Sequence, residues 1–219
     1  MKIIKPDVQF ITPIDGATIL KRLEQCGRVC YKSEDKITEG SAEKFVAGII
    51  KRGHEAVLEH CSFTVKFICD RGVSHEIVRH RMASYCQEST RYCNYGKGKF
   101  GEEITVIEPC FFHDQHSDQD WENYQKWEAA MADAEAWYME LLQNGATPQE
   151  ARSVLPNSLK TEVVMTANIR EWRHFLKLRC SPAAHPQMRQ VSDLILLDKV
   201  HALIPVCFDD IWSEYHADV

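Results

Sequence analysis

The run CSFTVKFIC, at residues 61 to 69, constrains the fold of this chain most directly. Its apolar side chains Phe63, Val65 and Phe67 alternate with polar ones. Successive side chains of a β-strand point to opposite faces, so this alternation predicts a strand that is buried on one face only. We therefore expect a sheet with helices packed on it.

Hydrophobic periodicity and capping residues predict the other elements. Further strands are expected at residues 3–13, 104–109 and 161–169. Helices are expected from Asp15 to about Lys32, from Ser41 towards Gly53, from Ser74 through Met82, from Asp118 to Gln143, from Thr147 to Pro156, at residues 168–179 and at residues 186–204. Strands and helices do not alternate in a regular βαβ rhythm, and no repeat or linker is visible. The pattern predicts one α+β domain over residues 1–219, with a central mixed or antiparallel sheet flanked by long helices.

Charge and composition exclude several classes of protein. The net charge of −6 disfavours a nucleic-acid binder, and no apolar run approaches the roughly 20 residues of a membrane span. Nine cysteines form no CxxC pair, so buried or idle reduced thiols in a cytoplasmic protein are favoured over zinc ligands. Lys5, Pro6 and Asp7 interrupt the apolar start of the chain, which argues against a signal peptide.

The stretch RHRMASYCQESTRY, residues 79 to 92, combines cations with hydroxyl and amide side chains. It fits either a solvated helix face, with Glu76 and Glu88 as ion-pair partners, or a pocket for an anion. Two more arginines, Arg152 and Arg179, shift the balance towards an anion, because guanidinium groups bind phosphates and planar imides in a bidentate manner. A phosphorylated metabolite is the expected ligand.

Other chemical interpretations fail on spacing. His75 and His80 are five residues apart, whereas two histidines that chelate zinc from one helix are four apart. Ser89 lacks the glycine-flanked turn of a hydrolase nucleophile, so a hydrogen-bonding role is expected. The glycine-rich residues 96–103 lack the ending of a phosphate-binding loop and predict a surface loop. His60 remains open as a core histidine or a ligand.

Several ordered motifs resemble one family. They are Arg79-His80-Arg81 followed by Ser89 after seven residues, Gly53-His54-Glu55 with Glu59-His60, ARSVLP at 151–156, TANIREWRHFLKLR at 166–179 and AHPQMRQ at 184–190. Together they resemble the flavin-dependent thymidylate synthases over about residues 50 to 190. The resemblance implies a fold of the thymidylate synthase-complementing type.

The resemblance also implies an enzyme that reductively methylates dUMP to dTMP. Methylenetetrahydrofolate would be the carbon donor, FAD the hydride carrier and NADPH the reductant. The expected assembly is a homotetramer whose sites are shared between chains. No nucleic-acid partner, membrane or metal is expected.

Site residues are carried over position by position. The expected flavin contacts are His54, Glu59, Arg79, His80, Arg81, Gln87, Asn168, Arg170 and His174. The expected dUMP contacts are Glu76, Arg79, Gln87, Glu88, Ser89, Thr90, Arg91, Arg152 and Arg179. Arg179 would be the catalytic residue, because a guanidinium beside the uracil imide stabilises the N3-deprotonated ring.

Four positions depart from the usual family pattern. Glu76 stands where many members have Gln, Cys86-Gln87 replaces Asn-Glu, Ala56 replaces a hydroxyl residue and His174 replaces Asn. Flavin-dependent C5-alkylation of another uridine nucleotide, such as UMP, is therefore an alternative. A non-catalytic nucleotide- or RNA-binding module, with Tyr85, Tyr92 and Tyr95 as a stacking platform, is a second alternative, which the acidic net charge disfavours.

The short connection between Arg79 and Arg91 bears on assembly. We expect Arg79 on a helix and residues 87–91 in an irregular loop that hardly folds back over that helix. A site that uses both arginines is therefore expected to take them from different chains of a symmetric oligomer.

Overall fold

The computed structural model describes residues 1–112 and 117–216 of the chain. The strands are β1 (Lys2–Ile4), β2 (Asp7–Phe10), β3 (Ser62–Asp70), β4 (Ala83–Gln87), β5 (Thr105–Ile107) and β6 (Lys160–Asn168). The α-helices are α1 (Gly16–Val29), α2 (Ser41–Lys51), α3 (Arg71–Ile77), α4 (Asp118–Gln143), α5 (Pro148–Ala151), α6 (Ile169–Arg179), α7 (Pro186–Arg189), α8 (Asp198–Leu203) and α9 (Pro205–Tyr215). Short 3₁₀ helices are η1 (Glu34–Lys36), η2 (Glu55–His60), η3 (Gly98–Phe100) and η4 (Arg152–Val154), and η5 (Gln190–Leu197) is a π-helix.

The main sheet has four strands in the order β2-β3-β6-β4. Thr64 Oγ1 lies 2.9 Å from Thr166 Oγ1, and the Ile169 N–H donates to the Cys61 carbonyl at 2.9 Å. From Cys61 to Thr64 the contacted residue moves back from Ile169 to Thr166, so β3 and β6 are antiparallel. A second sheet pairs β1 with β5 in parallel. The α+β class with an antiparallel central sheet is therefore confirmed.

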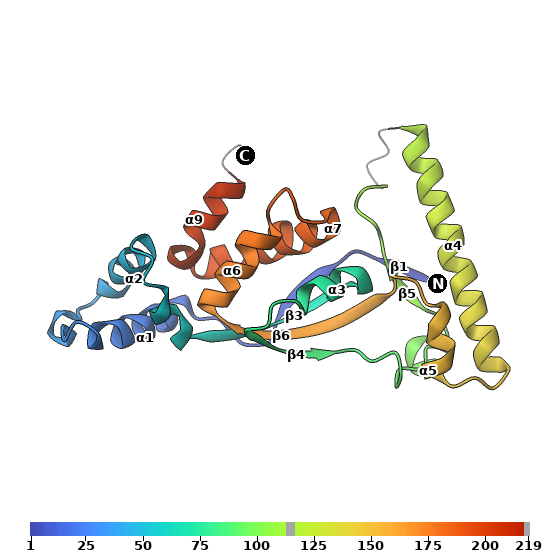
Figure 1. The fold of residues 1–219 in the computed structure, drawn as a ribbon, viewed down its shortest axis with the longest axis horizontal. Helices are drawn as coiled ribbons and strands as arrows, with labels where there is room; N and C mark the ends of the chain where they lie inside the picture. The colour runs from blue at the N-terminus through green and yellow to red at the C-terminus, as the bar shows by residue number, and fades with distance from the viewer. Residues whose placement is uncertain (113–116, 217–219) are drawn as a thin grey trace. The chain divides into compact units, whose positions relative to one another are not determined.

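The chain divides into two compact units. Unit 1 comprises Met1–Asp7, Phe67–Arg79 and Cys86–Val163, and unit 2 comprises Val8–Lys66, His80–Tyr85 and Val164–Val219. Strands β3 and β6 contribute residues to both units (Figure 1). The chain passes from unit 1 to unit 2 between Arg79 and His80, in the middle of the Arg-His-Arg motif.

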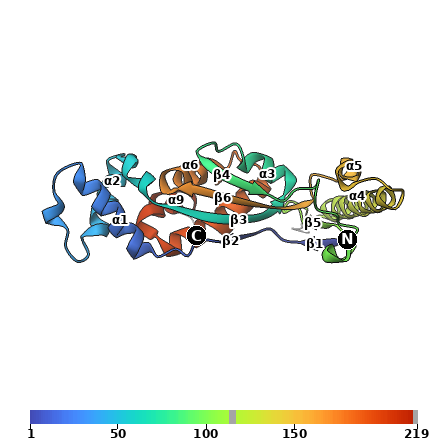
Figure 2. The same cartoon turned by 90° about the horizontal axis from the view of Figure 1, so that it is seen from below.

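Unit 1 has its core between α4 and the β1–β5 pair. Helix α4 lies beside β5 in both views (Figures 1 and 2), and Ile104 and Val106 are buried with Met131 and Tyr138 of α4. The Ser117 side chain accepts the Asp120 N–H at 3.2 Å and so caps the start of α4. The predicted boundaries of this helix, Asp118 and Gln143, are confirmed.

Unit 2 is organised around α6. Trp172 stacks on Phe63 of β3 at a ring-centroid distance of 5.0 Å, and its indole N–H donates to the Phe63 carbonyl at 3.2 Å. Both side chains are almost fully buried. Trp172 of α6 thus covers Phe63, one of the apolar side chains in the alternation that predicted β3.

An ion pair between a buried arginine and an exposed carboxylate joins α6 to α9. The Arg173 guanidinium, 2% exposed, donates to both carboxylate oxygens of Asp210 at 2.7 Å. It also donates to the Cys207 carbonyl. Burial alone would raise the pKa of Asp210, but the hydrogen bonds and charge of Arg173 leave that pKa below its ordinary value.

Most predicted elements are confirmed, including the Asp15 cap of α1 and the capping box of Thr147 and Glu150 before α5. The prediction of a single strand at residues 3–13 is wrong. Pro6 lacks an N–H and interrupts the ladder, so the segment forms β1, which pairs with β5, and β2, which pairs with β3. The predicted surface loop at residues 96–103 contains the short helix η3.

The helix predicted from Ser74 through Met82 is also wrong. Asp70, not Ser74, is the cap, since its side chain accepts the Val73 N–H at 2.7 Å. The helix α3 ends at Ile77, and the chain then joins the sheet as β4, so Arg79 does not lie on a helix. Pairing in the sheet has overridden the local helical pattern. Gln87 is likewise the last residue of β4 rather than part of a loop.

The helix expected at residues 186–204 is divided into α7, η5 and α8. The non-helical backbone of Ile204, with φ −141° and ψ 67°, ends it. Helix α9, which follows with Pro205 at its first position, was not predicted. Across the described ranges, every helix is too short or too polar to span a lipid bilayer.

Replacing Asp210 by alanine should destabilise the fold. The substitution leaves the buried Arg173 guanidinium without its carboxylate partner, so the free energy of unfolding in urea at pH 7 should fall by about 3 kcal/mol. The matched control is Asp209→Ala, which removes the neighbouring, 60% exposed carboxylate that contacts His201 and should cost less than about 1 kcal/mol. Equal losses in the two variants would contradict a structural role for the Arg173–Asp210 pair.

Candidate functional site

The junction between β6 and α6 builds the first part of the candidate site. Asn168 ends the strand, and its side chain accepts the Glu171 N–H at 2.9 Å, which caps the helix. Residues three and four apart share one helix face, so the cap directs Arg170, His174 and Lys177 to the same side of α6.

A cavity of about 410 Å³ lies against this face. Its lining residues are Glu55, Glu59, Met82, Asn168, Arg170, Glu171, Arg173, His174 and Lys177. Arg170 Nη1 donates to Glu59 Oε1 at 2.6 Å, and Arg170 Nε lies 3.6 Å from Glu55 Oε2. Of the residues expected to contact flavin, the cavity brings together Glu59, Asn168, Arg170 and His174.

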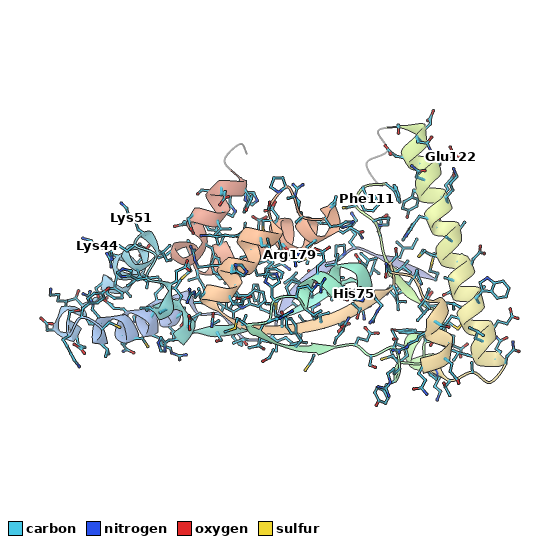
Figure 3. All side chains as sticks on the ribbon, viewed as in Figure 1. Lys44, Lys51, His75, Phe111, Glu122 and Arg179 are labelled. Carbon is cyan, nitrogen blue, oxygen red and sulfur yellow. The ribbon has the colours of Figure 1, made fainter. Side chains whose placement is uncertain are left out.

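A chain of three side chains connects α6 to the segment after Arg79. His80 Nδ1 lies 3.2 Å from Glu171 Oε1, and Arg179 Nε donates to His80 Nε2 at 3.1 Å. Arg179 ends α6, as Figure 3 shows. The ring of His80 is 5% exposed, and its backbone carbonyl accepts the Tyr85 hydroxyl at 2.6 Å.

These contacts assign the protonation state of His80. Guanidinium nitrogens only donate, so His80 Nε2 must be an unprotonated acceptor, and the proton lies on Nδ1, which donates to Glu171. The ring is therefore neutral, and its contact with Glu171 is a hydrogen bond rather than an ion pair. Burial, Arg179 and then His174 lower the pKa of His80 to about 4, in agreement with this state.

Among residues 1–112 and 117–216, the only group of at least three metal-ligating side chains with closely spaced ligand atoms is His80, Glu171 and His174. Both ring nitrogens of His80 already make hydrogen bonds, and the Arg179 cation beside the ring opposes a second cation. This group is therefore better explained as a hydrogen-bonded chain. All nine cysteines are free, and burial raises the pKa of Cys69 and Cys180, which makes them inert thiols.

Residues 88–93 of unit 1 form a tight turn after β4. The N–H groups of Tyr92 and Cys93 both donate to the Ser89 carbonyl, and Ser89 Oγ accepts the Arg91 N–H at 3.3 Å. Thr90 is buried, and its hydroxyl accepts from Arg152 Nη1 at 3.4 Å. Two of the expected dUMP contacts, Thr90 and Arg152, are therefore in direct contact.

The side chains of Gln87 and Glu88 are engaged within unit 1. Gln87 Nε2 donates to Ser74 Oγ at 3.0 Å. Glu88 accepts from the Tyr95 hydroxyl at 2.8 Å and from Lys160 Nζ at 3.0 Å. These bonds anchor the start of the turn, so the side chains that follow are held on a fixed backbone.

The remaining expected contacts are dispersed. Arg79, Arg81 and Arg91 are exposed, and Glu76 is half-buried on α3. His54 does not line the cavity of about 410 Å³, here called the flavin-side cavity. Its Nδ1 is 2.8 Å from the Tyr31 hydroxyl, and it lines a separate hollow of unit 2. His60 is exposed, so the interpretation as a core histidine is wrong.

Sequence reasoning missed five residues of this region: Glu55, Met82, Glu171, Arg173 and Lys177. Helical spacing could have identified two of them, because Glu171 and Lys177 are each three residues from His174 and so lie beside it on the surface of α6. Nothing in the local pattern pairs Glu171 with His80, which is 91 residues earlier. That contact depends on the tertiary fold.

Comparisons with known proteins give a consistent result. Residues 16–206 match the family described as thymidylate synthase complementing protein. The chain is 33% identical over 181 residues to the flavin-dependent thymidylate synthase of Pyrococcus furiosus, which covers 82% of this chain and 71% of that protein. It is 32% identical over 230 residues to the protein of the same name from Corynebacterium glutamicum, with 97% and 86% covered. The corresponding protein of Mycolicibacterium gilvum is 34% identical over 223 residues, with 94% and 84% covered.

Acid titration should reveal the neutral state of His80. Its pKa in the folded protein lies below the ordinary value of 6.5, so the unfolded chain binds the extra proton first as the pH falls. The stability that His80 contributes is thus present above pH 6.5 and is lost as the pH falls towards 4. The wild type should lose up to about 3 kcal/mol more over this interval than His80→Gln.

The measurement is urea unfolding at several pH values between 4 and 7. His60→Gln, which changes an exposed histidine, should retain the wild-type slope. Parallel curves for wild type and His80→Gln would mean that His80 titrates normally, against the hydrogen-bond assignment.

Proposed function

Because the chain belongs to the thymidylate synthase complementing protein family, we propose that it is a flavin-dependent thymidylate synthase. The reaction is the reductive methylation of dUMP to dTMP, with methylenetetrahydrofolate as carbon donor and NADPH as reductant. The observation that carries this proposal is the meeting of Glu59, Asn168, Arg170 and His174 at one cavity. Membership of this family supports an enzyme rather than the nucleotide- or RNA-binding module that the sequence left open.

The chemistry of the cavity fits FAD. Ligand cavities typically measure about 300–1,000 Å³ and combine apolar surface with a few polar groups. Arg170 and Lys177 offer exposed donors to an anionic group, and Met82 offers apolar surface. When bound, FAD supplies the hydride chemistry of the reaction.

Arg179 is the proposed catalytic residue. Its Nε–H is used by His80, so contact with the uracil imide falls to its Nη groups. A guanidinium held beside the ring stabilises negative charge as N3 loses its proton, which activates C5 without an enzyme nucleophile. His80 and Glu171 act as positioning residues for Arg179, because Glu171 holds His80 and His80 accepts a hydrogen bond from Arg179.

The turn at residues 88–93 is the proposed phosphate-binding segment. Ser89 and Arg91 would bind the dUMP phosphate, and Arg152, held by Thr90, would add a third contact. Charge-assisted hydrogen bonds of this kind contribute about 1.5–3 kcal/mol each. Arg79 and Arg81 are proposed to contact the flavin, with Arg79 also reaching the nucleotide.

The assembly and the location of the protein are part of the proposal. A homotetramer with sites shared between chains is the assembly that the motif resemblance implies. The two units are proposed to act as one domain, because each is assembled from three separate stretches of the chain. A cytoplasmic location is supported by the nine free cysteines, which suit a reducing compartment.

The activity is tested by an assay of purified protein for dTMP. The protein should be yellow and should form dTMP only when dUMP, methylenetetrahydrofolate and NADPH are all present. UMP serves as the competing substrate. Turnover of UMP in preference to dUMP would show that UMP is the substrate instead. A colourless protein that forms no dTMP would refute the proposed thymidylate synthase activity.

Arg179→Lys should separate chemistry from cofactor binding. Lysine keeps the charge but cannot donate to His80 and the imide in a planar arrangement, so kcat should fall by about tenfold or more while flavin content is retained. The control is Arg22→Lys on α1, an exposed position outside the flavin-side cavity. Wild-type turnover in flavin-loaded Arg179→Lys would show that Arg179 is not catalytic.

Mixed oligomers test the shared sites. Arg79→Ala and Arg91→Ala should each be inactive alone. If one site takes Arg79 from one chain and Arg91 from another, random mixing gives about a quarter of the sites both wild-type arginines. Co-expression should therefore restore part of the activity. Purified mixed oligomers that stay as inactive as either parent would place both arginines in one chain.

A further inference from the structure

A second hollow of unit 2, here called the cationic groove, lies between the end of α1 and helix α2. Its volume is about 630 Å³. It is lined by Arg28, Tyr31, Ser33, Lys36, Ser41, Lys44, Phe45, Gly48, Arg52 and His54. Apart from His54, none of these residues has a role in the proposed reaction. The lining contains four strong cations and no carboxylate.

The charges of this groove are only partly neutralised. Arg28 is paired with the buried carboxylate of Glu24 at 2.8 Å, and its guanidinium covers the Phe45 ring at 4.6 Å from the centroid. In contrast, Lys36, Lys44 and Arg52 are exposed and make no ion pair with any residue that the structure describes. These three unpaired cations make the groove locally positive, although the chain as a whole has a net charge of −6.

Gly48 makes room for one of these cations. A Cβ at this position would lie 3.1 Å from Arg52 Nη1, which is tighter than ordinary contact, so the guanidinium would have to shift. Glycine inside a helix costs about 1 kcal/mol relative to alanine. Its presence in the middle of α2 therefore lets the Arg52 guanidinium lie along the helix, at the groove.

Aromatic and hydroxyl groups complete the lining. Tyr31 is 54% exposed, and its hydroxyl lies 2.8 Å from His54 Nδ1, which fixes the ring at the edge of the groove. Exposed aromatic rings stack on nucleobases, and unpaired Lys and Arg side chains bind phosphates. The combination matches a nucleotide that carries several phosphate charges.

We propose that the cationic groove binds the phosphorylated adenosine end of a nucleotide co-substrate. NADPH and FAD both carry this group, and NADPH adds a 2′-phosphate. The choice of these two sources rests on the proposed function, whereas the anion site itself rests on Lys36, Lys44 and Arg52. Tyr31 holds the adenine, and the cations hold the phosphates.

The test is calorimetric binding of 2′,5′-ADP and 5′-ADP to the purified, flavin-loaded protein at low salt. In the double variant Lys44→Ala/Arg52→Ala, 2′,5′-ADP binding should weaken by about 30-fold or more. Lys51→Ala removes a lysine that lies on the same helix but does not line the groove (Figure 3), and it should bind like the wild type. Gly48→Ala should also weaken binding, by displacing Arg52, while a thermal melt shows an intact fold.

The two nucleotides distinguish the sources. Tighter binding of 2′,5′-ADP than of 5′-ADP to the flavin-loaded protein supports NADPH. Binding of 5′-ADP only to flavin-free protein supports FAD, because the adenosine diphosphate of bound FAD would then fill the groove. Unchanged affinity in the double variant overturns the proposal. These readouts do not depend on turnover. If the groove proposal fails, the evidence for dTMP formation is unaffected. If no dTMP is formed, nucleotide binding to the groove can still be measured.

Discussion

The hydrogen bond from Arg179 to His80 is the interaction on which the candidate site depends. It forms only if the imidazole is neutral with its proton on Nδ1, and that state in turn requires the Glu171 carboxylate as acceptor. Burial keeps the ring neutral by lowering its pKa to about 4. A charged His80 would repel the guanidinium that it now orients, so the direction of Arg179 is linked to the protonation of a buried histidine.

Helix α6 combines the structural and chemical requirements of unit 2. Trp172 packs on β3, Arg173 binds Asp210 of α9, and both side chains are buried. Arg170 and His174 line the cavity, and Arg173 borders it as well. Because core contacts and cavity contacts alternate along one rigid helix, the cavity residues have little freedom to move independently. This arrangement suits a site in which Arg179, the last residue of the helix, must be held in one orientation.

The sequence alone predicted those features that depend on local patterns. The strand at residues 61–69, the helix Asp118–Gln143 and the caps at Asp15 and Thr147 follow from periodicity and side-chain hydrogen bonding. The end of α3 did not follow, because pairing of β4 in the sheet decides it. The partnership of Glu171 with His80 depends on residues far apart in the chain, and no single-sequence pattern encodes it. The motif resemblance supplied the family, and the comparisons confirm it.

The tautomer of His80 tests the central claim most directly. Nitrogen-15 NMR of protein labelled at histidine distinguishes a protonated Nδ1 from a protonated Nε2 and from a charged ring, and His80→Gln identifies the signal. At pH 7 we expect a neutral ring with the proton on Nδ1, and Glu171→Gln should perturb this signal more than the control Glu162→Gln does. A charged ring, or a neutral ring protonated on Nε2, would contradict the hydrogen bond from Arg179 and with it the proposed orientation of the catalytic guanidinium.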